Sequence, residues 1–182
     1  MAFVRVVWPV IQAHCPDLRG SVLRLVEGSR ENPIASDLDV CAGIDAYLRA
    51  PLGLRGISSR VQWGKDYRTF TVRVERPNGA LTEYLKRLIT IRRVQEGFLY
   101  PYWTIQAYVE RPGGKLLSVA VAKTVELYLY IEQCKQRGRP CHERPASNGG
   151  ERFLYVEWEP YRQAGNYLFV YPGLVRPISP AS

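Results

Sequence analysis

An aspartate and a short polar strand hold the side chains of this sequence that could act together on a phosphodiester. Asp45 lies in a largely apolar segment, 40–48, that reads as a buried strand. Successive side chains of a strand point to opposite faces, so Ser58, Arg60 and Gln62 share one face of the next predicted strand. If that face lies beside Asp45, a carboxylate, a guanidinium and an amide meet at one point. Such a group could hold a phosphodiester.

Positive charge is concentrated around and after this strand. Residues 55–93 contain ten Lys and Arg against three Asp and Glu, whereas the two flanking parts of the chain are nearly balanced. A local surplus of this kind favours polyanions. We therefore expect contacts with DNA or RNA; the alternative is a solvated basic face that only keeps the protein soluble. The residues expected to contact nucleic acid are six cations and one exposed ring that can stack on a base: Lys65, Arg68, Arg73, Arg76, Lys86, Arg87 and Tyr67.

Periodicity and turn residues predict the elements that must position these side chains. The helical region 9–27 breaks at Cys15-Pro16, because proline cannot continue a helix interior. Strands 57–63 and 67–75 are separated by a Gly-containing loop of hairpin length, which predicts that they pair. The remaining predicted elements are a helix at 80–95, a hairpin of 102–110 and 115–121, a helix at 122–136, strands at 153–159 and 167–171, and a loosely held tail from Pro172. This order predicts one α/β domain (α+β mixed), 1–182, with a mixed sheet flanked by helices.

Composition and motifs exclude several classes of protein. The chain has 182 residues, of which 46% are hydrophobic and 23% charged, as in an ordinary globular domain. Its uncharged apolar runs are too short to span a bilayer, and residues 2–12 lack the features of a secretory signal, so we expect a cytoplasmic protein with no membrane partner. No Gly-rich phosphate loop precedes a helix, which argues against nucleotide hydrolysis. Two histidines leave little room for a Ser-His-Asp hydrolase.

The four cysteines lack the close paired spacing of zinc ribbons and redox motifs. Free thiols are the expected state. The alternative is a metal site built from Cys134, Cys141 and His142, which would need a fourth ligand such as Cys15 or His14.

The acid, strand and helix together resemble the PD-(D/E)XK nuclease superfamily over roughly 40–121. In that family an Asp ends one strand, and the adjacent strand carries an acid and, two residues later, a Lys. Asp45 within Ala-Gly-Ile-Asp-Ala-Tyr-Leu matches the family Asp, while Ser58 falls at the acid position and Arg60 at the Lys position. The resemblance implies a mixed sheet flanked by helices, and Mg²⁺ or Mn²⁺ as cofactor if the protein is catalytic. Ser58 is a poorer ligand than a carboxylate, and Arg60 keeps a positive charge but cannot act as a base.

Some members of this superfamily carry the missing acid on the neighbouring helix, which implies Glu83 as the second metal ligand here. Helical periodicity turns Glu83 away from the predicted apolar face, so a surface pair with Arg87 four residues later is the simpler alternative. Glu27, at the end of the first helical region, is another candidate ligand. The implied catalytic group is Asp45, Arg60 and Glu83.

The functional expectation is a nucleic-acid-binding protein of restriction-endonuclease-like fold. It is either a divalent-metal-dependent nuclease or a catalytically silent relative of one. The alternative is a phage or mobile-element protein that binds and modulates a host protein machine, with the basic tract facing an acidic partner. A sheet with short terminal strands could also pair across a two-fold axis, giving a homo-oligomer.

Overall fold

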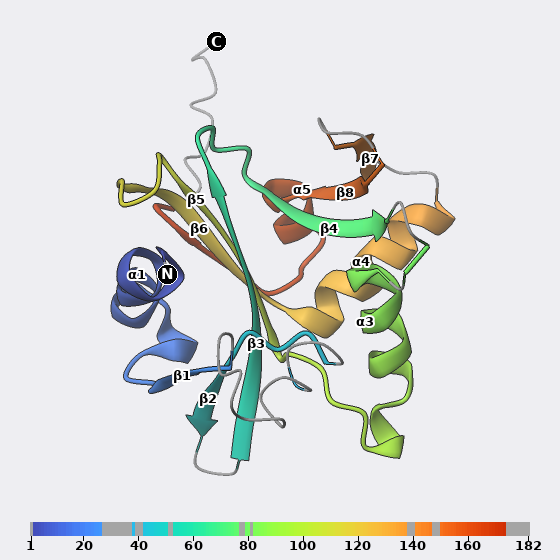
Figure 1. Ribbon diagram of the computed structural model, residues 1–182, viewed down its shortest axis with the longest axis horizontal. Coiled ribbons are helices and arrows are strands. Elements are labelled where there is room, and N and C mark those ends of the chain that lie inside the picture. Colours follow the sequence, from blue (N-terminus) through green and yellow to red (C-terminus); the bar gives the residue numbers. More distant parts are fainter. Residues whose placement is uncertain are drawn as a thin grey trace.

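Two β-sheets and the helices packed on them make up the structure (Figure 1). The computed structural model describes residues 2–26, 38, 42–50, 53–76, 79–80, 82–137, 141–146 and 150–173. The larger sheet has six strands in the order β1 (Leu23–Leu25), β2 (Ala46–Ala50), β3 (Gly53–Trp63), β5 (Trp103–Val109), β6 (Leu116–Lys123) and β9 (Leu168–Tyr171). Strands β3 and β5 are parallel, and the other neighbours are antiparallel. The predicted mixed α/β class is therefore confirmed.

The smaller sheet contains β4 (Thr69–Glu75), β8 (Arg152–Glu157) and β7 (His142–Pro145), all antiparallel. The predicted hairpin of 57–63 with 67–75 is wrong, because β3 pairs with β2 and β5 whereas β4 pairs with β8. The reason is burial on both faces of β4: Thr69 and Thr71 are buried as well as Phe70 and Val72. The chain therefore leaves one sheet after β3 and enters the other.

The helices agree with the sequence in the second half of the chain and differ in the first. Helix α4 (Thr124–Gln136) and the β5–β6 hairpin lie where periodicity predicts them. The second helical piece expected before residue 27 is wrong: a short 3-10 turn, η2 (Pro16–Leu18), leads into β1, whose backbone pairs with β2. The other helical elements are η1 (Phe3–Val7), α1 (Trp8–His14), α3 (Glu83–Arg92), η3 (Val94–Glu96) and α5 (Trp158–Gln163).

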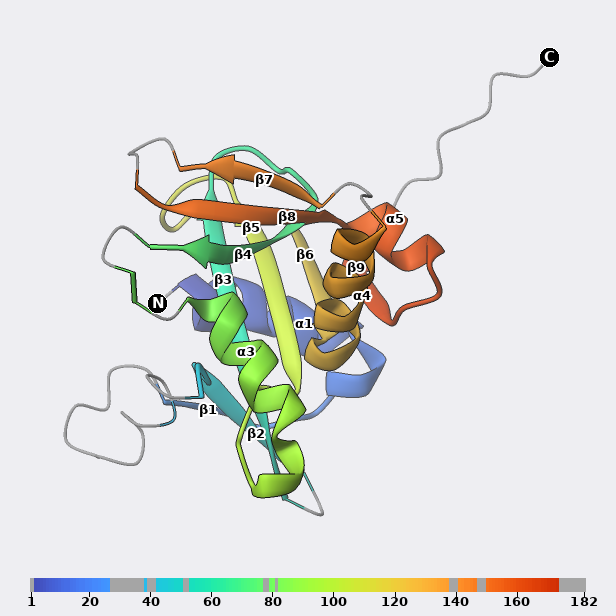
Figure 2. The same ribbon diagram turned by 90° about the vertical axis from the view of Figure 1, so that its right-hand side faces the viewer.

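Hydrophobic side chains cover both faces of the six-stranded sheet. Helix α1 lies on one face, and α3, α4 and the three-stranded sheet lie on the other (Figures 1 and 2). Successive side chains of β5 point to opposite faces of the sheet: Ala107 packs in the cluster with α1, and Tyr108 packs in the cluster with α4. Among the described residues, no helix is long and apolar enough to cross a membrane.

Helix α3 connects the two sheets, and its start determines the geometry of the site. Thr82 caps it, since the Thr82 hydroxyl accepts a hydrogen bond from the Leu85 N–H at 3.3 Å. Of the predicted apolar face, Tyr84 is buried and Leu88 is partly buried against the α4 side, but Leu85 is 44% exposed. The helix is therefore rotated from the predicted orientation, and its first residue, Glu83, faces the neighbourhood of β3.

Candidate functional site

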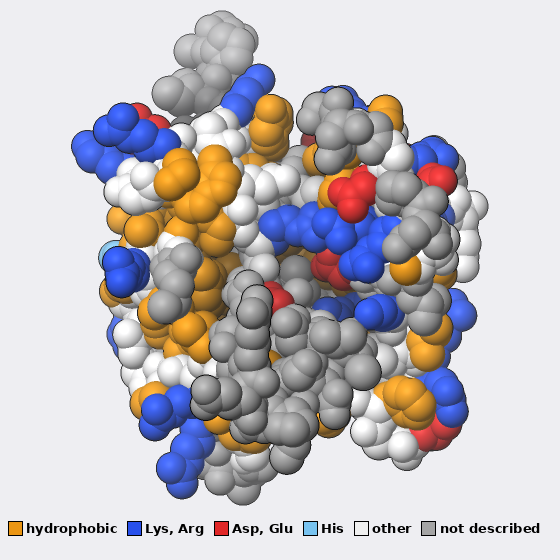
Figure 3. All heavy atoms as spheres, in the orientation of Figure 1, with side chains coloured by type: hydrophobic (Ala, Val, Ile, Leu, Met, Phe, Trp, Pro, Cys, Tyr) orange, Lys and Arg blue, Asp and Glu red, His pale blue; other side chains and the backbone are white. Residues whose placement is uncertain are grey.

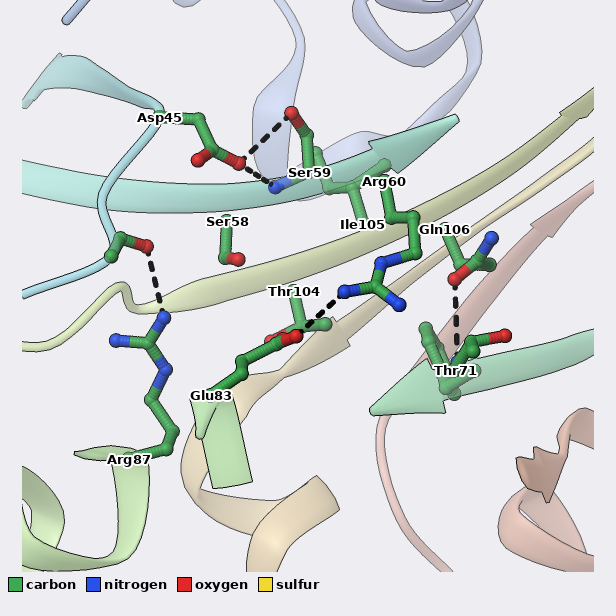
Figure 4. A pocket seen from close by; sticks show the side chains of 12 residues that line it. Asp45, Ser58, Ser59, Arg60, Thr71, Glu83, Arg87, Thr104, Ile105 and Gln106 are labelled. Carbon is green, nitrogen blue, oxygen red and sulfur yellow. Dashed lines mark hydrogen bonds and ion pairs between the residues drawn. The ribbon is translucent and has the colours of Figure 1, made fainter. Parts of the chain in front are cut away.

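Asp45 lies immediately before β2, beside the middle of β3 (Figure 4). Its backbone N–H donates to the Ile57 carbonyl at 2.8 Å, and its Oδ2 accepts from both the backbone N–H and the hydroxyl of Ser59. The ladder between β2 and β3 ends at the pair Ala46 and Ile57, so the Ser59 N–H lies beyond it and can bond a side chain. The carboxylate therefore contacts Ser59 rather than the Ser58 face.

Arg60 and Glu83 form an ion pair across the space between β3 and α3. The Arg60 Nη2 lies 2.7 Å from the Glu83 Oε2, and the two side chains are 27% and 24% exposed. The expected surface pair of Glu83 with Arg87 is therefore replaced by a half-buried pair with a β3 residue. Helical periodicity alone could not predict this, because it does not fix which face of α3 borders the sheet.

Arg87 is buried, with 3% of its surface exposed, and it holds the turn that precedes Asp45. Its guanidinium donates to the Ala42 carbonyl and, at 2.9 Å, to the Gly43 carbonyl. Gly43 has a φ of +58°, and a Cβ atom at this position would lie 2.6 Å from Arg87 Nη2. The sequence prediction of Arg87 as a surface cation is thus not matched, because its charge is satisfied by backbone oxygens inside the protein.

The floor of this region is polar because of a glutamine that sequence reasoning missed. Gln106 is 2% exposed on β5; its Oε1 accepts from the Thr71 N–H and its Nε2 donates to the Gln62 Oε1, both at 3.3 Å. The sequence did contain a signal for this polar site, because Gln106 interrupts the otherwise largely apolar run Trp103–Val109. Such a buried amide needs partners, and here it finds them on both sheets.

Together these side chains enclose a cavity of about 180 Å³, which we call the β3–α3 cavity. Its polar lining includes two carboxylates and two guanidinium groups, with neutral oxygens between them: Asp45, Glu83, Arg60, Arg87, Ser58 and Gln106. The formal charges of the acids and bases cancel. The nearby phenol of Tyr128 is buried, and burial raises its pKa, with the negative charge of Glu83 adding to the effect. The cavity is therefore a neutral site built from opposite charges.

The other predicted nucleic-acid contacts lie outside this cavity, and some are ion-paired. Tyr67 is 58% exposed, as predicted, and Lys65 Nζ lies 5.4 Å from the centre of its ring. Arg68 pairs with Asp66 at 3.4 Å, and Arg73 pairs with Glu151 at 3.3 Å. Arg76 and Lys86 are half-buried. Figure 3 shows acidic and basic side chains mixed near the middle of one face, so the basic tract is partly neutralised by acids of the same chain.

The two carboxylates of the cavity match the oxygen donors that Mg²⁺ and Mn²⁺ take in proteins. Mg²⁺ is usually held by one or two carboxylates, with waters and substrate phosphates completing its shell. Asp45 and Glu83 supply that number, and Ser58 supplies a neutral oxygen. The third predicted ligand, Glu27, lies outside the described residues.

Among the residues that the structure describes, no three His, Cys, Asp or Glu side chains are grouped to hold a metal, either at the β3–α3 cavity or at the cysteines. The alternative site at the cysteines therefore has no support in this part of the chain. His14 stacks on Tyr171, with ring centres 4.5 Å apart, and Cys15 lies buried 3.7 Å from the Tyr167 hydroxyl. Cys134 and Cys141 are free thiols, and burial raises the pKa of Cys141 to about 12.

Comparison with protein-family models, curated proteins and solved structures finds no match to this chain. The resemblance to PD-(D/E)XK nucleases therefore stays a prediction from the pattern around Asp45 and Arg60.

Proposed function

We propose that this protein binds nucleic acid and holds one of its phosphodiester groups at the β3–α3 cavity. The observation that carries the proposal is the half-buried pair of Arg60 and Glu83 at a cavity that Asp45 and Arg87 also line. A planar guanidinium matches the oxygens of a phosphate, and Arg60 could exchange its carboxylate partner for one. Because the cavity is neutral, the longer-range attraction would come from the surrounding cations, such as Lys65 and Arg76.

A second candidate function is metal-dependent cleavage of the phosphodiester, and the position of Glu83 favours it. Glu83 lines the same cavity as Asp45, as expected of a metal ligand moved from the strand to the helix. A divalent cation bound there would lower the pKa of a water molecule and stabilise developing negative charge. Ser59 would orient Asp45 through its two hydrogen bonds. Arg60, released from Glu83, would neutralise the phosphate without acting as a base.

Binding of labelled single-stranded and duplex DNA and RNA across a salt series tests the first function. We expect affinity to fall steeply with salt, because each neutralised phosphate releases counterions. Incubating the same strands with Mn²⁺ or EDTA tests the second, with Asp45→Asn and Glu83→Gln as inactive variants and Glu96→Gln as a matched surface control. Binding without cleavage would support the first function and contradict the second. Neither binding nor cleavage would contradict both and favour a protein partner.

A further inference from the structure

A second, larger hollow lies next to the β3–α3 cavity, where the two sheets meet. Its volume is about 470 Å³, and we call it the β8 groove because β8 and the adjoining start of α5 form one wall. Aromatic and hydrogen-bonding side chains line it, among them Gln62, Tyr67, Arg68, Tyr155, Glu157 and Trp158. This mixture of ring faces and polar edges is typical of a site for a planar, partly polar ligand.

The backbone at Arg68 is held in a conformation that keeps Tyr67 at the edge of this groove. Arg68 has a φ of +49°, which is unfavourable for a residue with a side chain. Its N–H donates to Asp66 Oδ1 at 3.1 Å, and its carbonyl accepts from the Trp158 N–H at 3.0 Å. These bonds fix the strained turn that precedes β4. Tyr67 stays 58% exposed, although its ring also meets the Tyr108 ring edge-on at 6.1 Å between centres.

The hydrogen bonds of Gln106 orient the Gln62 amide. Gln106 Oε1 accepts from the Thr71 N–H, so its Nε2 must donate, and it donates to Gln62 Oε1. The NH₂ group of Gln62 is thereby left as a donor, with no further partner among the described residues. Gln62 lines the groove, and Glu157 on β8 supplies an acceptor on the same lining. A ligand edge that carries both an acceptor and a donor would satisfy the two groups.

On both β3 and β4, a residue that lines the groove lies two positions along the strand from a residue that lines the cavity. Arg60 and Thr71 line the cavity, while Gln62 and Thr69 line the groove. Residues two apart in a strand are separated by about 7 Å. That distance is within reach of a single nucleotide whose phosphate and base occupy neighbouring sites.

We propose that the β8 groove binds one unpaired base of the nucleic acid whose phosphate lies in the β3–α3 cavity. The base would stack on Tyr67 and present its edge to Gln62 and Glu157. A base paired within a duplex has its face covered by neighbours and its edge bonded to the other strand, so the substrate class is single-stranded or locally unpaired nucleic acid. This inference rests on the proposed function.

The test compares a labelled strand of about 12 thymidines with an abasic strand of the same length and backbone charge, by fluorescence anisotropy. We expect the wild type to bind the thymidine strand more tightly. Tyr67→Ala should weaken binding of the thymidine strand by about 5- to 150-fold, the value of one base–aromatic stack, and leave the abasic strand unchanged. Phe98→Ala is the matched control, since Phe98 is 38% exposed and lies outside the groove lining. Gln62→Met, which keeps the length and removes the donor, should weaken the thymidine strand alone.

Equal affinity of the wild type for the two strands would overturn the inference while leaving nucleic-acid binding intact. A loss in Tyr67→Ala that is the same for both strands would also overturn it, because the ring would then act on the backbone or the fold. Failure of the wild type to bind either strand would instead contradict the proposed function, and this inference would fall with it.

Discussion

Two regions, one where α3 borders the β3–α3 cavity and one just after α3 ends, each contain an arginine, a glutamate and a glycine in different surroundings. At the cavity, Arg87 is buried, Glu83 is paired with a residue of another element, and Gly43 packs against the guanidinium. Just after α3 ends, Arg93 pairs with Glu96 three residues later at 2.5 Å, both side chains are about half exposed, and Gly97 follows.

The number of cations in a stretch of sequence therefore does not determine the electrostatic potential of the surface that the stretch forms. Arg87 and Arg93 lie six residues apart in the basic tract. Arg87 donates its hydrogen bonds to the backbone carbonyls before Asp45, whereas Arg93 donates to the carboxylate of Glu96, which is exposed to solvent. Only the first organises residues that are distant in the chain. We therefore expect changes at the cavity to affect stability far more than matched changes around Arg93.

The largest expected effect is on the buried guanidinium. Arg87→Met should lower the free energy of unfolding by about 3 kcal/mol, because the Ala42 and Gly43 carbonyls lose charged donors inside the protein. Arg93→Met should leave it nearly unchanged, because an exposed ion pair is screened by solvent. Urea unfolding of the two variants measures the contrast. Equal losses would show that Arg87 has no special structural role.

A glycine pair gives the next contrast. Gly43 and Gly97 both have positive φ, at +58° and +85°, but a Cβ would meet Arg87 at Gly43 and nothing within 4 Å at Gly97. Gly97→Ala should cost about 1–2 kcal/mol from backbone strain alone. Gly43→Ala should cost at least about 1 kcal/mol more, because the collision also displaces a buried charge. Thermal unfolding at matched concentration measures both, and the same cost at both sites would argue against the tight packing at Gly43.

The two carboxylates should differ less. Glu83→Gln removes a half-buried ion pair and a negative charge from the start of α3, so we expect a loss of about 1 kcal/mol. Glu96→Gln removes an exposed pair, so the expected loss is smaller than for Glu83→Gln. Double-mutant cycles with Arg60→Met and Arg93→Met isolate each coupling energy. A stronger coupling at the surface pair would reverse the ranking.

The smallest effect is a shift in one titration. The hydrogen bond from Arg93 holds the pKa of Glu96 below its ordinary value of 4.5, because the guanidinium favours the ionised carboxylate. Because the pKa of Glu96 is lower in the folded than in the unfolded protein, the pair stabilises the fold at pH values above the unfolded-state pKa. This stabilisation is lost as the pH falls through the lower, folded-state pKa. An NMR titration should show the Glu96 pKa rising in Arg93→Met. An unchanged pKa would mean that the pair does not persist in solution.

The sequence predicted the elements whose signals are local. The Gly-Gly turn before Lys115 predicted the β5–β6 hairpin, and the helix predicted over 122–136 corresponds to α4. The alternation of Phe70 and Val72 predicted their burial. The partner of β4 could not be predicted, because β8 lies about eighty residues later and no local pattern specifies that pairing.

The sequence could predict several of the residues that line the candidate site, but it could not predict which groups those residues contact. The sequence named Asp45 and Arg60 as residues that could meet if the Ser58 face of the strand lay beside Asp45; both line the cavity, but the Asp45 carboxylate bonds Ser59 instead. The contact of Asp45 with Ser59 depends on where the β2–β3 ladder ends, and the burial of Arg87 depends on how α3 is rotated over the turn at Gly43. Gln106 was missed because a single polar residue in a strand gives no sign of what it bonds.

The most direct test of the central claim, that the β3–α3 cavity holds a nucleic-acid phosphate, is the affinity of Arg60→Met for a labelled single strand. Arg93→Met is the matched control for lost charge, and thermal unfolding checks that both variants are folded. We predict that Arg60→Met binds at least about tenfold more weakly, with the slope of log K against log salt reduced by about one, while Arg93→Met stays close to the wild type. Equal binding by Arg60→Met and Arg93→Met would contradict the account.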